Sequence, residues 1–399
     1  MQSLFTVADC QCADCGLAFY QTLATGHTAS DVLSLAREDL RIYPAKKNWL
    51  TEELIRAFSE SHRNEFPIRK IVHEECDEVV ILNTLDFLYG HVLLKLYNAL
   101  YHLDYHKDVG LVLIIPAIFE WLVPRGCAEV WVVDAPLSAF RGGNTFVREF
   151  ITWECERFHT VYVSRAYSHP DFAMMDISRF TGTRPFDLAR FVDLHPVITF
   201  VLREDRWWFA TRGDYWFYRA CRKLKLLRLG SRVLSRRQNG LVKKTISSIR
   251  KRLPHADFYV TGLGTTGTFL GFAHDKRMNV INAPVERDWC ATYARSHVVV
   301  GVHGSNMLLP TAHAAGCLEV LPPDRAGNMV QDISVRYTDR RQLFLYRFAD
   351  QYAETKSVAD KLVSMINDYP IFYNNMCGNV YKTPATDVEQ TMIFGASRQ

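Results

Sequence analysis

Long apolar runs are missing from this sequence, and their absence sets the first expectations. A membrane-spanning helix needs about 20 consecutive apolar residues, and no stretch of the 399-residue chain reaches that length. The first residues also lack a basic segment followed by an apolar core, so we expect no secretory signal there. The sequence therefore predicts a cytoplasmic protein that contacts a membrane, if at all, only at its surface.

A strong excess of one charge is also missing. The chain carries 47 Lys and Arg against 43 Asp and Glu, and 48% of its residues are hydrophobic. This composition is typical of an ordinary globular protein and excludes a disordered one, and its length suffices for two or three domains. We therefore expect charged partners to bind only where charged residues cluster locally.

The ten cysteines are scattered, except for a C-x-C-x-x-C array formed by Cys10, Cys12 and Cys15. Close thiolates suit tetrahedral zinc, and His27 is the nearest candidate for the fourth ligand, with Cys76 more distant. Without an export signal, reduced thiols are the other interpretation. A structural zinc ion and free thiols therefore both remain open.

Strands alternate with helices in two successive segments of the chain. In the first segment we expect strands at 79–82, 111–115, 129–133 and 160–163, and helices at 91–102, 118–123 and 147–158. In the second we expect strands at 197–202, 258–260, 280–281, 298–300 and 317–321, and helices at 239–252, 286–294 and 307–315. This alternation predicts an α/β fold with two doubly wound parallel sheets.

Four parts of the chain follow from this pattern. They are an N-terminal extension at 1–66, a Rossmann-like domain at 67–190, a second Rossmann-like domain at 191–350, and a C-terminal helix and tail at 351–399. Residues 28–66 are polar and are expected to be helical, with Thr51 as an N-cap. A last amphipathic helix is expected at 355–367.

The segment Val298–Pro323 predicts one βαβ unit with a glycine turn at its centre. A buried strand is followed by Gly301-Val302-His303-Gly304-Ser305-Asn306, a short helix and a second strand. Such a turn lies at the carboxyl edge of a parallel sheet, where ligands bind in open α/β folds. Gly304 permits close backbone approach to an anion, and His303 adds a side chain that can donate a hydrogen bond.

This segment resembles the donor-site motif of family 61 glycosyltransferases and their GT-B relatives. The shared pattern is an apolar strand, G-x-H-G-small, a helix, and an apolar strand ending in an acid and proline, here Glu319 and Pro322-Pro323. Family members usually place an Asn several residues beyond the glycine, whereas Asn306 follows almost at once. The resemblance implies two Rossmann-like domains that face a cleft, with the diphosphate of a nucleotide sugar at Gly304, Ser305 and Asn306 and its ribose near Glu319.

The resemblance also implies where positive charge meets the donor. Family members carry an Arg at the strand end, here Arg203, and a second Arg closely followed by Asn at a helix start. Arg237 and Asn239 fit the second element if residues 204–236 are an insertion, and Arg206 is the alternative if they are not. The chain has no D-x-D motif at a strand end, so Arg203 and His303 would neutralise the diphosphate without a catalytic metal.

These features predict a metal-independent, inverting glycosyltransferase that moves a sugar from a UDP- or GDP-linked donor to a glycan or lipid-linked acceptor. Inversion requires a base that deprotonates the acceptor hydroxyl. Asp86 and His91 flank a turn at the expected edge of the first sheet, on the acceptor side, and Asp134 ends a neighbouring strand. Each of the three is a candidate base, and each has the alternative role of helix cap or loop residue.

Gly262-Leu263-Gly264-Thr265-Thr266-Gly267 supports a different function. It matches G-x-G-x-x-G after a strand, and Glu286 lies roughly twenty residues further on, as in dinucleotide-binding folds. An NAD-dependent oxidoreductase is therefore an alternative prediction. In the preferred interpretation, Gly262 and Gly264 form a loop on the same sheet edge that touches the nucleotide-sugar donor.

Residues 204–236 interleave aromatic with basic side chains. They are Trp207, Trp208, Phe209, Tyr215, Trp216, Phe217 and Tyr218 with Arg212, Arg219, Arg222, Lys223, Lys225, Arg228 and Arg232. Such a pattern suits an anionic membrane surface, single-stranded nucleic acid, or a helix that packs its aromatics on a core. No recognition fold accompanies it, so we expect no nucleic-acid partner. A GT-B-shaped membrane-docking protein without catalysis is the third functional alternative.

Overall fold

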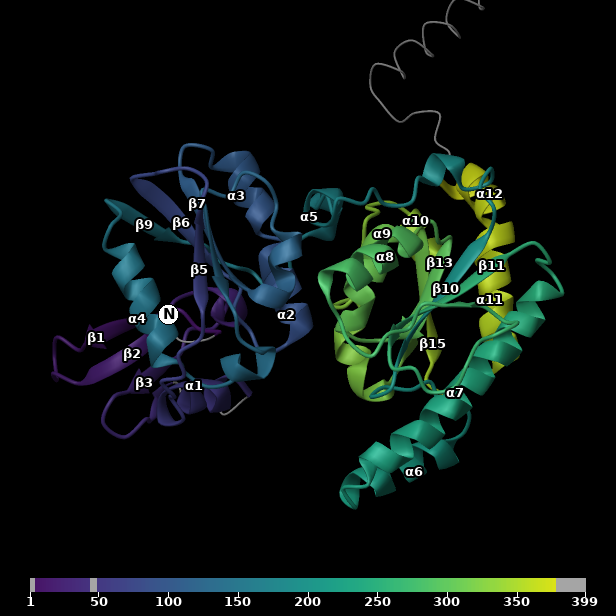
Figure 1. The fold of residues 1–399 in the computed structure, drawn as a ribbon, viewed down its shortest axis with the longest axis horizontal. Coiled ribbons are helices and arrows are strands. Elements are labelled where there is room, and N and C mark those ends of the chain that lie inside the picture. The colour runs from purple at the N-terminus through teal and green to yellow at the C-terminus, as the bar shows by residue number, and fades with distance from the viewer. Residues whose placement is uncertain (1–3, 44–48, 378–399) are drawn as a thin grey trace, which may run out of the picture. The chain divides into compact units, whose positions relative to one another are not determined.

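The computed structural model describes residues 4–43 and 49–377, which form two compact units (Figure 1). Unit 1 comprises the described residues up to Thr183 together with Asn282–Arg287. Unit 2 comprises Arg184–Ile281 and the described residues from Asp288 onward. The chain therefore changes units close to the domain boundary that the sequence predicts at residue 190.

Unit 1 begins with a small antiparallel sheet rather than with the expected helix over 28–66. Its order is β1-β2-β3-β4, with β1 at Val7–Gln11, β2 at Ala18–Thr22, β3 at Ser34–Ala36 and β4 at Ile42–Tyr43. Helix α1 covers Trp49–Ser59, and Thr51 lies buried inside it instead of capping it. Phe5, Leu35 and Leu54 are buried together, so the polar composition of this region concealed a small apolar core.

The main sheet of unit 1 has the order β5-β8-β7-β6-β9. Its strands are β5 (Ile68–Val72), β6 (Glu78–Asn83), β7 (Gly110–Pro116), β8 (Glu129–Val133) and β9 (Thr160–Val163). Only β5 pairs antiparallel. After β6 the chain adds β7 and β8 on one side of this strand, and it then returns to add β9 on the other side. The topological switch point of the sheet therefore lies between β6 and β9. The four strands expected here are confirmed.

The helices of unit 1 follow the expected pattern with one break. They are α2 (Tyr89–Leu96), α3 (Ala99–Tyr105), α4 (Thr145–Cys155) and α5 (Ser178–Thr181), with 3-10 turns at Gly26–Thr28, Ala117–Leu122, Leu137–Phe140 and Phe172–Met174. The helix expected at 91–102 is divided into α2 and α3 at Asn98. Asn98 bonds through its side chain to the main chain of Tyr167, a contact no local pattern reveals.

Unit 2 is built on a six-stranded, fully parallel sheet with the order β12-β11-β10-β13-β14-β15. The strands are β10 (Val197–Arg203), β11 (Asp257–Leu263), β12 (His274–Asp275), β13 (Val298–Val302), β14 (Gly316–Leu321) and β15 (Tyr346–Asp350). Taken in chain order this is the 3-2-1-4-5-6 arrangement of doubly wound nucleotide-binding sheets, with its switch point between β10 and β13. Every residue of β13 is buried, as expected for a central parallel strand.

The helices of this part of the chain follow the strands, and α6 extends away from the sheet (Figure 1). They are α6 (Arg212–Lys223), α7 (Leu227–Arg250), α8 (Ala283–Tyr293), α9 (Leu308–His313), α10 (Arg341–Leu345), α11 (Thr355–Asn367) and α12 (Tyr369–Phe372), with shorter turns at Leu188–Arg190, Ser305–Met307, Pro323–Asn328 and Tyr373–Cys377. The first residues of α8, up to Arg287, belong to unit 1. α11 has the expected bounds and packs on α7, with Val358 and Leu362 in the core of unit 2. The strand expected at 280–281 is absent from the described structure, because Val280 is exposed.

None of the helices in the described ranges is both long and apolar enough to cross a bilayer.

Candidate functional site

An arginine joins the two loops at the switch point of unit 2. Arg206 lies three residues beyond the end of β10, and its Nη1 donates a hydrogen bond of 2.9 Å to the carbonyl oxygen of His303, just beyond β13. Gly304 makes room for this contact, because a Cβ added there would lie 2.2 Å from Nη1 of Arg206. The absence of a side chain at Gly304 therefore leaves room for the guanidinium of Arg206.

Charges of both signs surround Arg206. Burial lowers the pKa of its guanidinium, and the neighbouring charges of Arg203 and Arg325 lower it further, while Asp205 and Asp332 act in the opposite sense. Arg203 already holds Asp205 through two contacts. Arg206 instead bonds to a neutral carbonyl, so its charge remains available to an anion.

The imidazole of His303 lies beneath the turn, with 1% of the residue's surface exposed. Its Nδ1 is 2.7 Å from Oε2 of Glu319, and its Nε2 is 3.4 Å from Oδ2 of Asp332. Burial raises the pKa of Glu319 to about 7, against the lowering effect of the hydrogen bond with His303. The expected direct contacts of His303 with a diphosphate and of Glu319 with a ribose are therefore corrected: both side chains support the turn from below.

Two further residues of the turn were expected to meet the donor. Ser305 begins a 3-10 turn, which continues into the short helix α9 rather than into a helix over 307–315. Oδ1 of Asn306 is buried and has no hydrogen-bond partner among the described residues. An unsatisfied buried polar atom costs about 1–3 kcal/mol, and a Cβ on Gly304 would lie 3.0 Å from it. Asn306 and Arg206 thus flank the same glycine, and a bound ligand could satisfy Asn306.

The glycine-rich loop at 262–267 holds a carboxylate of the protein. The backbone N–H of Thr266 donates to Oε1 of Glu204 at 2.7 Å, and its hydroxyl donates to Oε2 at 2.8 Å. Gly262 and Gly264 have φ of +103° and +106°, and a Cβ on either would collide with Leu202 or Glu204. The predicted contact of Gly262 and Gly264 with a donor is corrected, because Leu202 and Glu204 occupy the space beside these glycines.

The same loop does not have the context that a dinucleotide fingerprint needs. In the described structure no helix follows Gly267 directly, and the chain passes instead to β12. Glu286 lies in the first turn of α8 rather than at a strand end. A Rossmann fingerprint requires its glycines to open a helix and its acid to follow a strand. The geometry therefore counts against the NAD interpretation.

Arg237 and Asn239 are engaged elsewhere. Arg237 pairs with the buried Asp214 of α6, and Nδ2 of Asn239 donates to the carbonyl of Thr266 at 2.7 Å. Their predicted role at the diphosphate is corrected, since both stabilise the neighbouring α6 and the 262–267 loop. Of the two arginines that the sequence left as alternatives, the geometry favours Arg206.

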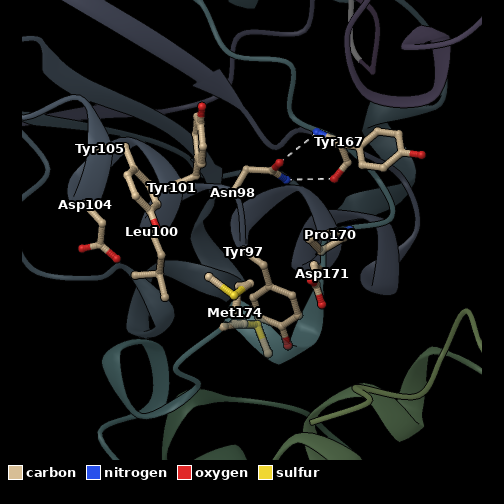
Figure 2. Close-up of a pocket in the computed structure, with 11 residues that line it drawn as sticks. Tyr97, Asn98, Leu100, Tyr101, Asp104, Tyr105, Tyr167, Pro170, Asp171 and Met174 are labelled. Carbon is tan, nitrogen blue, oxygen red and sulfur yellow. Dashed lines mark hydrogen bonds between the residues drawn. The ribbon is translucent and has the colours of Figure 1, made fainter. Parts of the chain in front are cut away.

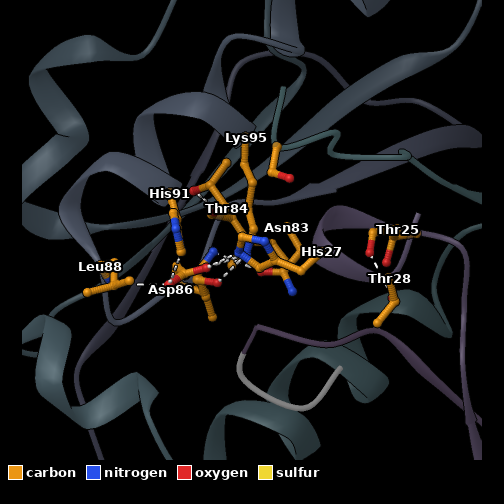
Figure 3. Close-up of polar contacts among 12 residues, drawn as sticks. Thr25, His27, Thr28, Asn83, Thr84, Asp86, Leu88, His91 and Lys95 are labelled. Carbon is orange, nitrogen blue, oxygen red and sulfur yellow. Dashed lines mark hydrogen bonds and ion pairs between the residues drawn. The ribbon is translucent and has the colours of Figure 1, made fainter. Parts of the chain in front are cut away.

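Unit 1 carries a second polar cluster at its own switch point, centred on the fully buried Asp86 just beyond β6 (Figure 3). Oδ2 of Asp86 is 3.1 Å from Nε2 of His27 and 3.0 Å from Nζ of Lys95, and Oδ1 is 3.3 Å from Nδ1 of His91. The backbone N–H of Gly26, next to His27, donates to the carbonyl of Arg165 beyond β9. The cluster therefore ties together the loops on both sides of the switch point.

The charges in this cluster define a tautomer for each histidine. Burial favours a raised pKa for Asp86, but Lys95, His27 and His91 together hold it well below its usual value. An ionised carboxylate only accepts hydrogen bonds, so Nε2 of His27 and Nδ1 of His91 carry the protons. Burial also lowers the pKa of His27 to about 4, so it is neutral. Nε2 of His91 is then the ring nitrogen that does not bond to Asp86, on a side chain that is 17% exposed.

Asp134 is not part of this arrangement. It is exposed at the end of β8, which is separated from β6 by β7 in the sheet order. An exposed carboxylate outside the cluster lacks the buried partners that fix Asp86 and His91. The structure therefore does not support Asp134 as an alternative base, because Asp134 lies away from the Asp86 cluster.

The predicted zinc ligands are not gathered around one point. Cys10 lies in β1, and Cys12 and Cys15 lie at the turn before β2, where hydrogen bonds from the backbone and side chain of Cys15 lower the pKa of Cys12. His27 belongs instead to the Asp86 cluster. Within residues 4–43 and 49–377, the group of side chains whose spacing could hold a metal ion is His27, Asp86 and His91. Their potential ligand atoms all lie within 4.8 Å of one another. The ammonium of Lys95 bonds to the same carboxylate and would compete with a cation there.

An open pocket of about 440 Å³ lies beside α3 in unit 1 (Figure 2). Its wall is mainly aromatic and sulfur-containing, formed by Tyr97, Tyr101, Tyr105, Tyr167, Met174 and Met175. Asp104 lies at its rim and is held by Arg179. The sequence predicted no pocket here; the spacing of Tyr101 and Tyr105, which are four residues apart and both exposed, was the available signal for an aromatic edge.

Comparison with known proteins adds no relative: no protein-family model matches the chain, and no curated protein matches it.

Proposed function

We propose that this chain is a metal-independent, inverting glycosyltransferase of the GT-B class, which moves a sugar from a UDP- or GDP-linked donor to a glycan or lipid-linked acceptor. The observation that carries the proposal is Arg206 at the switch point of a 3-2-1-4-5-6 sheet, held against the turn that resembles the family 61 donor motif. That point of a doubly wound sheet is where nucleotides bind.

The donor diphosphate would lie over Gly304, between the guanidinium of Arg206 and the main chain at Ser305 and Asn306. Arg325 adds positive charge around it, whereas Arg203 is paired with Asp205. When the bond between the anomeric carbon and the diphosphate breaks, the electron pair stays on the diphosphate. A fixed arginine opposite this developing charge lowers the barrier without a divalent cation, by about 3–4 kcal/mol for one well-placed donor.

His91 would receive the proton of the acceptor hydroxyl on Nε2. Asp86 holds the opposite nitrogen and stabilises the imidazolium that forms, as in other carboxylate–histidine pairs. The acceptor oxygen then attacks the anomeric carbon from the side opposite the leaving diphosphate, which inverts the configuration. Lys95 and His27 have a positioning role, since they keep Asp86 ionised and in place.

The tyrosine-lined pocket would hold a more distant part of the acceptor. Sugar rings present apolar C–H faces that pack against aromatic rings, and pockets for small ligands combine such walls with a few polar groups. Tyr97 follows His91 by six residues, which is about 9 Å along a helix. That spacing suits an acceptor of more than one sugar.

Thermal melting with three ligands tests the proposal against its alternatives. UDP or GDP at a hundredfold excess over its dissociation constant should stabilise the protein by about 2.7 kcal/mol, and Arg206→Gln should remove this shift. Arg236→Gln, which removes an exposed arginine of α7, should keep it. A shift with NAD alone would favour an oxidoreductase. No shift with any of the three would favour a docking protein without catalysis.

A further inference from the structure

A helical hairpin extends from unit 2 beyond the sheet and its covering helices (Figure 1). We call residues 212–236, which comprise α6 and the first part of α7, the α6–α7 hairpin. Thr211 and Asp214 form a capping box at its start. A Cβ at Gly230 would lie 2.6 Å from Sγ of Cys221, so this glycine lets the two helices pack closely. The hairpin is therefore a preformed element.

The aromatic residues of this region divide into two groups. Trp207, Trp208 and Phe209, which precede the hairpin, are buried, and Nε1 of Trp207 donates to Ser235. These three serve packing. Trp216, by contrast, is 63% exposed on α6, and the guanidinium of Arg219 lies over its ring.

The tip of the hairpin exposes further large apolar side chains. Leu224 and Leu229 are each 65% exposed, and Leu226 and Val233 are also exposed. Leu226, Leu229 and Val233 are spaced so that they share one face of the helix. Exposing these side chains to water is unfavourable compared with burying them in an apolar environment. Clusters of exposed apolar residues therefore mark interaction sites.

Basic residues surround this apolar tip. Between residues 212 and 236 there are eight Lys and Arg and one acidic residue, Asp214, which is buried and paired with Arg237. The basic residues are Arg212, Arg219, Arg222, Lys223, Lys225, Arg228, Arg232 and Arg236, and all of them are exposed. The chain as a whole carries only +4, so the hairpin concentrates positive charge.

We propose that the α6–α7 hairpin docks this protein on an anionic lipid surface. The leucines and Trp216 would enter the boundary between headgroups and acyl chains, and the neighbouring Lys and Arg would reach back to the headgroups. Protein interfaces are depleted in Lys at their centre, whereas here Lys225 lies between two exposed leucines at the tip. Stacking platforms for single-stranded nucleic acid need several exposed aromatic rings, and of the seven aromatic residues of this region only Trp216 and Phe217 are exposed.

Co-sedimentation of the full chain with lipid vesicles tests this docking and does not depend on catalysis. The parent should bind vesicles of phosphatidylcholine with phosphatidylserine, bind phosphatidylcholine alone weakly, and lose binding at high salt. Replacing Arg222, Lys223, Lys225 and Arg228 with Ser should weaken binding by about a hundredfold or more, since each surface charge contributes about fivefold. Replacing Leu224, Leu226 and Leu229 with Ser should also weaken it.

A charge-matched control separates the hairpin from general attraction. Lys107, Lys244, Lys251 and Lys356 are exposed outside the hairpin, and their replacement with Ser should leave vesicle binding within about twofold of the parent, because charges away from the contact act only through screened solvent. All replaced side chains are exposed, and unchanged melting temperatures would confirm intact folds. Failure of the parent to bind anionic vesicles, or equal losses in the control and hairpin variants, would overturn the proposal. Binding to single-stranded RNA without binding to vesicles would overturn it in favour of a nucleic-acid site.

Discussion

A single buried carboxylate, Asp86, decides what its neighbours in unit 1 can do. It accepts from two histidines and one lysine, which come from positions 27, 91 and 95. The sequence offered Asp86 and His91 as rival bases, but the geometry gives them different tasks. Lys95 and the two histidines hold the pKa of Asp86 low against its burial, so Asp86 is a poor base and a good partner for His91.

We expect His91→Gln to reduce sugar transfer by about a hundredfold to ten-thousandfold, the usual contribution of a positioned general base. Donor binding should be unaffected, because the proposed donor site lies in residues of unit 2. The measurement is the initial rate of transfer together with the thermal shift produced by UDP or GDP. His73→Gln replaces an exposed histidine of the same unit and should retain full activity. Near-parental rates in His91→Gln would remove this residue from the mechanism.

At the scale of elements, the turn after β13 depends on Gly304 for space. Its φ is +155°, and an added Cβ would collide with the end of the Arg206 side chain rather than with backbone. A flexible side chain can move aside, but a non-glycine backbone at φ +155° and ψ 169° is strained by about 1–3 kcal/mol. This strain is smaller than the stability of a typical domain, so Gly304→Ala should fold with a lower melting temperature. It should nevertheless displace Arg206 from the carbonyl of His303 and abolish the thermal shift with UDP or GDP.

Gly327 provides the matched control for this prediction, because open space surrounds the position of its missing Cβ. Gly327→Ala should keep the ligand-induced shift and the parental melting temperature. A parental shift in Gly304→Ala would mean that the anion binds away from this turn. A loss of the fold in that variant would show instead that the turn has no room to rearrange.

The central strands were predictable from the sequence because burial on both faces leaves continuous apolar runs. Val298–Val302 and Leu111–Ile115 are such runs, and both are strands. The short strands β3 and β4 carry no such signal and were missed. The division between α2 and α3 depends on the bond of Asn98 to Tyr167, and no local pattern reports a contact across 69 residues.

The candidate site was predictable in its location but not in its contacts. The glycine turn at 301–306 was expected at the sheet edge and lies there. Which arginine meets it could not be read from spacing, because the choice between Arg206 and Arg237 depends on the buried Asp214 that pairs with Arg237. The contacts of the G-x-G-x-x-G loop could not be read from spacing either, since the carboxylate of Glu204, far away in sequence, accepts hydrogen bonds from Thr266 in that loop.

At the scale of the whole molecule, both units follow one rule of construction. In each, the first parallel strand of the sheet ends beside a topological switch point, and a buried or half-buried charged side chain follows it. That side chain is Asp86 beyond β6 in unit 1 and Arg206 beyond β10 in unit 2. The opposite signs suit different tasks: a buried carboxylate orients a histidine, and a half-buried guanidinium attracts an anion.

Both units should also lose stability together in acid. Burial lowers the pKa of four histidines from 6.5 to about 4, namely His27 and His102 in unit 1 and His297 and His313 in unit 2. Between these values the unfolded chain binds protons at these positions and the folded chain does not. Their contribution to stability is therefore present above pH 6.5 and is lost as the pH falls towards 4.

Glu286 and Glu319 act in the opposite sense, because burial raises their pKa from 4.5 to about 7 and their contribution is lost as the pH rises. Four histidines outweigh two glutamates, so we expect the free energy of unfolding to fall on acidification by about 1.4 kcal/mol per pH unit for each net proton taken up. Urea unfolding followed by tryptophan fluorescence across this pH range measures the slope. Glu319→Gln removes one opposing group and should steepen the loss, whereas a stability that rises on acidification would show that the histidines are not buried as neutral groups.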